Sequence, residues 1–231
     1  MPIMDPGIVS NWSKPTPPVP WVVIAITFPC IIGMLIYSVL SPMQQQAMID
    51  VAGAIPADTA MMLNQAPGDW LDYGLPALFS SMFVHASWLH LTGNLAYLWV
   101  FGVTVEHKLG GLFMAALFLL GGALANVMVA MRLPVLDTPV IGASGAVSAV
   151  VGAYLGLFPG KRIGLFLPLG LYLQFAKVPA LLVIGSWFTL QLVYSAFGPI
   201  TGAVAWWTHL AGFALGLIFA MLARALAQLR F

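Results

Sequence analysis

Long stretches without charged residues alternate with short polar segments along the chain. A helix needs about 20 mostly apolar residues to span a membrane. Four uncharged stretches have room for one such helix each, and a fifth, between Lys177 and Arg224, has room for two. The pattern therefore predicts an all-α polytopic membrane protein with six spans, at about 21–40, 86–105, 110–131, 143–158, 179–197 and 203–222. The short gap at 163–176 is interpreted as an interfacial or re-entrant segment.

The composition supports a membrane protein and excludes other classes. Of the 231 residues, 61% are hydrophobic and 6% are charged, whereas about 25% of the residues in a soluble domain are charged. With a net charge of +1 and no basic stripe, nucleic-acid binding is excluded. The single cysteine, Cys30, excludes a disulfide framework and a thiolate zinc site. A zinc metalloprotease is excluded, because the chain has no HExxH motif and the span interiors hold no carboxylate. We expect no metal and no cofactor.

The distribution of Lys and Arg predicts the orientation in the membrane. With six spans, most basic residues fall on the side that also holds both termini. They are Lys14, Lys108, Lys161, Arg162, Lys177, Arg224 and Arg230. The opposite side has only Arg132, together with several aspartates. Because cytoplasmic loops are enriched in Lys and Arg, we expect both termini to be cytoplasmic.

Two segments outside the predicted spans, an N-terminal arm and a long loop, have a distinct composition. Residues 1–20 are rich in proline and are expected to form a cytoplasmic arm, with 21–231 as a single six-helix membrane domain. The loop at 42–82 carries many large apolar side chains, so we expect it to lie partly in the interface or on the bundle. The N-terminus has no basic segment and no convincing cleavage site, so no signal or transit peptide is expected. This favours a prokaryotic plasma membrane.

Several polar side chains fall within the predicted spans, where polar groups are costly and indicate function. They are His90, Asn94, Asn126, Ser144, Ser148 and His209. His90 and Asn94 are four residues apart and share one helix face. The topology places this pair, Ser144 and His209 in the outer half of the bilayer, so we expect one site that opens to the extracytoplasmic side. Asn126 is expected to bond between helices.

Small residues form stripes on the fourth and sixth spans. The two stripes are Ser144, Ser148, Gly152 and Gly156, and, one turn below His209, Gly212 and Gly216. Such stripes let two helices approach closely. If the stripes face each other, Ser144 and His209 meet at the outer end of the contact.

A serine becomes a nucleophile when a neighbouring neutral histidine takes its proton. Ser144 opens its helix between Gly142 and Gly145, and free N–H groups at a helix start can stabilise an oxyanion. His90 and Asn94 could add side-chain donors to the same hole. No buried carboxylate is present to orient the histidine, so these residues predict a Ser–His dyad for acyl transfer.

Three segments resemble motifs of the rhomboid family, in the same order and on the same spans. The family's second span, with two histidines and an asparagine, is similar to residues 83–102, FVHASWLHLTGNLAYLWVFG. The nucleophile motif is similar to GASG at 142–145. The sixth-span histidine with its glycines is similar to THLAGFALG at 208–216. The resemblance covers about residues 70–222. It implies an intramembrane serine endopeptidase that cleaves transmembrane segments of single-span proteins near the outer face of the lipid bilayer.

The resemblance also implies roles for individual residues. Ser144 corresponds to the nucleophile and His209 to the general base. His90, Asn94 and the backbone amide of Ser144 correspond to the oxyanion hole, and His85 to a residue near the water-accessible mouth. The supporting positions are Gly142, Gly145, Ser148 and Gly212.

Two features of the resemblance leave questions for the structure. Many family members carry a tyrosine four residues after the nucleophile, with its ring against the catalytic histidine, and this chain has Ser148 there. The change either loosens His209 or lets Ser148 hydrogen-bond to it. The fifth span, with Trp187 and Phe188 near its middle, corresponds to the helix that the family is thought to use as a substrate gate.

Two other functions stay open. A catalytically silent rhomboid-like protein would bind client helices without cleaving them, but such proteins usually lack the serine or the histidine, and both are present here. A small transporter would show inverted repeats or broken helices around a site at the midplane. The chain has no such repeat, and its polar set lies in the outer half.

Overall fold

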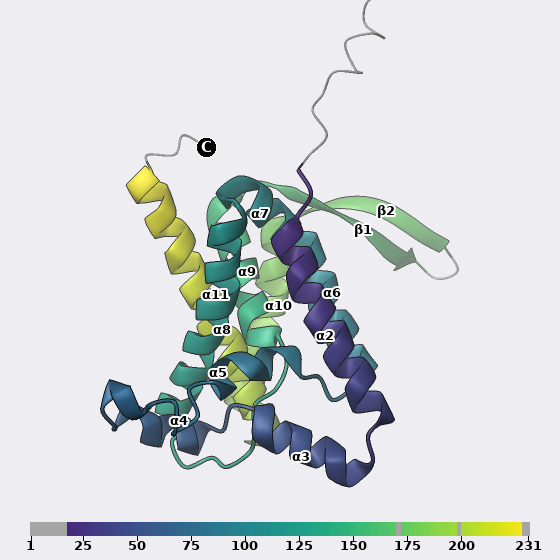
Figure 1. The fold of residues 1–231 in the computed structure, drawn as a ribbon. Coiled ribbons are helices and arrows are strands. Elements are labelled where there is room, and N and C mark those ends of the chain that lie inside the picture. Colours follow the sequence, from purple (N-terminus) through teal and green to yellow (C-terminus); the bar gives the residue numbers. More distant parts are fainter. Residues whose placement is uncertain (1–17, 170–171, 198–199, 228–231) are drawn as a thin grey trace, which may run out of the picture.

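The computed structural model describes residues 18–169, 172–197 and 200–227, so most of the predicted arm at 1–20 lies outside the described residues. A helix or helical segment lies at each of the six predicted positions (Figure 1). These are α2 (Trp21–Val39), α6 (Trp88–Tyr97) continued by η4 (Leu98–Gly102) and α7 (Val103–Leu109), α8 (Gly111–Arg132), α9 (Ser144–Leu157), α10 (Ala180–Phe197) and α11 (Ile200–Ala227).

Three described segments are long and apolar enough to cross a membrane by length and composition: α2, α8 and Trp206–Ala225 of α11. The apolar segments of α9 and α10, Ser144–Leu157 and Ala180–Val193, are shorter. The protein is therefore an integral membrane protein. Six spans with both termini in the cytoplasm stay a prediction.

Helix α9 is the centre of the bundle. Nearly all of its residues are buried, and α8 and α11 pack against it. A side chain on Gly152 would meet the backbone of Phe213 on α11, and one on Gly216 would meet the backbone of Ala149 on α9. The two small-residue stripes therefore face each other, which the sequence left as a condition, and their glycines allow backbone-to-backbone contact.

The loop between the first two spans folds into short helices at one end of the bundle (Figure 1). They are α3 (Pro42–Ala52), α4 (Pro56–Leu63), η2 (Pro67–Asp69), α5 (Ala77–Ser80) and η3 (Ser81–Phe83). Met62 and Leu78 are buried in a small core with Ala123 of α8. Asn126 of α8 donates from Nδ2 to the Leu78 carbonyl oxygen at 3.3 Å and to Ser81 Oγ at 3.1 Å. The predicted packing on the bundle and the predicted bonding of Asn126 are confirmed.

The prediction of an all-α protein is wrong at residues 163–176, which lie in a β-hairpin, while their interfacial or re-entrant placement stays a prediction. Strands β1 (Arg162–Leu169) and β2 (Tyr172–Pro179) pair antiparallel, from Arg162 opposite Pro179 to Leu169 opposite Tyr172. The hairpin projects from the end of the bundle that holds α7 and the start of α2 (Figure 1). A segment too short to span the membrane can pair its own backbone N–H and C=O groups by folding into a hairpin. The helical periodicity of the sequence does not predict such pairing.

A buried carboxylate joins α7 to the start of α2 at the same end. Both oxygens of Glu106 accept hydrogen bonds, one from the N–H of Val22 and one from the N–H of Val23, at 2.9 Å each. The first N–H groups of a helix have no partner within it, and they favour a negative charge. Glu106 therefore caps α2 from a distant part of the chain.

Candidate active site

The turn before α9 sets the position of Ser144. Gly142 has a φ of +105°, a conformation that side-chain-bearing residues rarely adopt, and a Cβ there would lie 2.5 Å from Cε1 of His90. Its N–H donates to the Ser81 carbonyl oxygen at 2.8 Å. The tight, anchored turn explains why glycine stands immediately before Ala143 and why α9 begins at Ser144.

His85 contacts this turn and is fully buried. Its Nε2 lies 3.3 Å from the backbone nitrogen of Ala143, which donates to it, so its proton lies on Nδ1. Burial, with a smaller contribution from the neighbouring His90, lowers the pKa of His85 to about 4. The resemblance placed this residue near the water-accessible mouth. In the structure the side chain is enclosed and holds the loop that carries Ser144, and its place near the mouth stays a prediction.

Helix α6 carries His90 in its first turn and Asn94 one turn later. Ser87 caps this helix, and its Oγ accepts a hydrogen bond from the His90 N–H at 3.2 Å. Asn94 is buried, and its Nδ2 has no hydrogen-bond partner among the described residues. A buried amide donor without an acceptor is costly, so it is available to a group that enters the site.

His209 of α11 is held by side chains of two helices. Its Nδ1 lies 3.0 Å from Oε1 of Gln191 on α10. The ring centroid of Trp187, also on α10, lies 6.1 Å from that of His209, and the ring of Trp206 meets it edge-on at 6.0 Å. These contacts restrict the orientation of the imidazole.

The four principal residues that the sequence predicted line one cavity of about 240 Å³. The cavity is lined by Leu89, His90, Gly93, Asn94, Tyr97, Ser144, Val147, Ser148, Val151, Trp187 and His209. They come from α6, α9, α10 and α11, so side chains far apart in the sequence converge. No hydrogen bond joins Ser144 to His209 among those of the described residues. Such bonds are often long without substrate and tighten when it binds.

The supporting positions Gly145, Ser148 and Gly212 lie where α9 meets α11. Ser148 Oγ donates to the Ser144 carbonyl oxygen at 2.6 Å, so the hydrogen bond from Ser148 to His209 that the sequence left open is not formed. A serine within a helix reaches its own i−4 carbonyl more readily than a neighbouring helix. A Cβ on Gly145 would lie 2.6 Å from Cγ2 of Thr208, and one on Gly212 would meet the Gly145 carbonyl oxygen. Both glycines keep α9 and α11 in contact beside the cavity.

A family model for the rhomboid domain matches residues 73–226. The chain belongs to the rhomboid family. Rhomboid protein 1, mitochondrial, of Saccharomyces cerevisiae is 28% identical over 152 residues, which are 62% of this chain and 40% of that protein. Rhomboid-like protein 11, chloroplastic, of Arabidopsis thaliana is 33% identical over 98 residues, which are 41% of this chain and 35% of that protein. This rhomboid chain thus spans less than half the length of either relative.

Sequence reasoning missed Gln191, which is 5% exposed and contacts the histidine of this rhomboid site directly. An uncharged amide near the middle of an otherwise apolar span was a usable signal, because a buried amide needs a partner.

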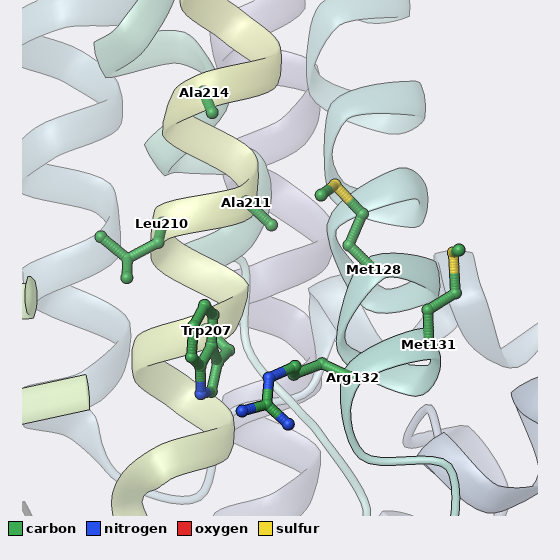
Figure 2. A pocket seen from close by; sticks show the side chains of 7 residues that line it. All are labelled: Met128, Met131, Arg132, Trp207, Leu210, Ala211 and Ala214. Carbon is green, nitrogen blue, oxygen red and sulfur yellow. The ribbon is translucent and has the colours of Figure 1, made fainter. Parts of the chain in front are cut away.

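A second, larger cavity of about 390 Å³ lies between α8 and α11 and contains none of the predicted site residues (Figure 2). Apart from Arg132, its lining is apolar. The guanidinium carbon of Arg132 lies 5.3 Å from the ring centroid of Trp207, on the opposite rim. The described residues that line this cavity include no serine, cysteine or histidine.

Proposed function

We propose that this protein is an intramembrane serine endopeptidase with Ser144 as nucleophile and His209 as general base. The proposal is supported chiefly by the convergence of Ser144, His209, His90 and Asn94 on one cavity. Membership of the rhomboid family supports it further. We propose transmembrane segments of single-span proteins as substrates, cut from the extracytoplasmic side of a prokaryotic plasma membrane.

The residues support a two-step acyl transfer. Ser144 Oγ attacks the scissile carbonyl carbon while its proton passes to the ring of His209. The oxyanion accepts hydrogen bonds from the Ser144 N–H, from Nδ2 of Asn94 and from the ring of His90. The C–N bond then breaks, and His209 returns the proton to the leaving amine. Water next attacks the acyl-enzyme ester, again through His209, and the carboxylic product leaves with the serine hydroxyl restored.

The decisive experiment is cleavage of a single-span reporter in proteoliposomes by the wild type and by Ser144→Ala. We expect a product from the wild type and none from Ser144→Ala, because the alanine has no nucleophilic oxygen. Ser186→Ala is the matched control, since its hydroxyl is exposed on α10 and bonds only within that helix. It is expected to cleave at the wild-type rate. Cleavage by Ser144→Ala would overturn the assignment.

A serine-directed fluorophosphonate separates the protease from the client-binding alternative. Labelling of the wild type but not of Ser144→Ala supports an activated serine, even when the chosen reporter is not cut. If a folded wild type neither labels nor cuts, the protease is contradicted and client binding is favoured.

A further inference from the structure

A hydrogen bond between two neighbouring helices reaches the proposed base. Gln191 lies on α10 and is 5% exposed, and its Oε1 lies 3.0 Å from Nδ1 of His209 on α11. An amide side chain buried in an apolar helix is costly unless it is hydrogen-bonded. The bond therefore accounts for the glutamine and also constrains the histidine.

The bond determines which ring nitrogen carries the proton. An amide oxygen only accepts hydrogen bonds, so Nδ1 of His209 must donate. In a neutral imidazole the other nitrogen, Nε2, then has a free lone pair. That nitrogen is the one left to accept the proton of Ser144.

We infer that Gln191 is a positioning residue that holds His209 in the tautomer with Nδ1 protonated, so that Nε2 serves as the base. The inference rests on the proposed function. It places on α10 a neutral counterpart of the carboxylate that orients the histidine in a Ser–His–Asp triad.

Helix α10 also supplies a ring contact to the same imidazole. Trp187 precedes Gln191 by four residues, so the two side chains share one face of α10. The ring of Trp187 is tilted by 37° to that of His209, with centroids 6.1 Å apart. Trp187 thus gives His209 an aromatic neighbour, which Ser148, at the position of the family's tyrosine, cannot give. The orientation of the base therefore depends on how α10 packs against α11.

The test compares Gln191→Leu with Gln191→Glu. Leucine has a similar size but no acceptor, whereas a glutamate oxygen still accepts from Nδ1. Loss of one neutral hydrogen bond corresponds to a decrease in kcat of about tenfold. We expect Gln191→Leu to show this decrease with little change in KM, and Gln191→Glu to restore kcat toward the wild-type value. Ser186→Ala is the control for substitution on α10.

Nitrogen-15 spectra of histidine-labelled protein in nanodiscs report the tautomer directly, with His209 assigned from a His209→Gln variant. We expect a proton on Nδ1 in the wild type and in Gln191→Glu, and a mixture of tautomers in Gln191→Leu. A role in packing alone would not move this signal.

Two outcomes would overturn the inference. One is the finding that His209 of the wild type carries its proton on Nε2. This measurement does not depend on whether any Gln191 variant folds. The other is an unchanged tautomer and kcat in folded Gln191→Leu. Failure of the proposed function is distinct from both, because it appears as cleavage by Ser144→Ala, while the spectra still report on the contact between Gln191 and His209.

Discussion

The side-chain amide of Asn94 is a buried donor in the proposed oxyanion hole. Its Nδ2 is buried without an acceptor among the described residues. An oxyanion would supply that acceptor only during the reaction, so the interaction strengthens where charge develops. This is the arrangement that lowers a barrier rather than one that merely tightens substrate binding.

Replacing Asn94 with alanine therefore lowers kcat more than it raises KM. Removal of one oxyanion donor corresponds to a loss of about 10²–10³-fold in kcat. Steady-state cleavage of the reporter in proteoliposomes measures both parameters. Thr92→Ala is the control on the same helix, because Thr92 is exposed and its hydroxyl bonds to the Trp88 carbonyl oxygen. An unchanged kcat in Asn94→Ala would exclude the oxyanion role of Asn94.

At the scale of elements, contact between α9 and α11 keeps the proposed nucleophile and base in one cavity. Ser144 lies at the first position of α9 and His209 lies within α11. The glycines between these helices leave no space for a side chain. A larger residue there must push the helices apart, since packed interiors accept little extra volume.

Gly216→Ala is expected to lower the free energy of unfolding by roughly 1–3 kcal/mol, the range for overpacked cores, and to reduce cleavage. Its new Cβ would meet the carbonyl oxygen of Ala149. Gly185→Ala on α10 is the matched control, because a Cβ there meets nothing within 4 Å. Denaturation in SDS measures both stabilities. Equal stability of the two variants would show that the close contact does not hold the helices.

At the scale of the whole molecule, the sequence predicted the helix positions and the residues of the cavity well, because both depend on strong local patterns. Charges are excluded from membrane helices, and the motif residues recur at helical spacing. The hairpin of β1 and β2, the burial of His85 and the contact of Gln191 with His209 were not predicted. Each depends on which segments meet in space, and a local pattern does not contain this information.

The capping of α2 by Glu106 is one such long-range contact, and it joins the first helix to the rest of the bundle. Glu106→Ala leaves two helix N–H groups without their acceptor, at a cost of about 2–3 kcal/mol. We expect faster hydrogen exchange at Val22 and Val23 and a lower free energy of unfolding, with an intermediate effect in Glu106→Gln, which keeps one acceptor oxygen. Exchange measured by mass spectrometry on peptides from α2 tests this expectation. Figure 1 shows α7 at the opposite end of the bundle from α3 and α4. The turn before α9 is anchored on Ser81, which directly follows α5, and α5 packs against α3. Folded Glu106→Gln is therefore expected to retain cleavage. Unchanged exchange in Glu106→Ala would show that α2 is held by its apolar contacts alone.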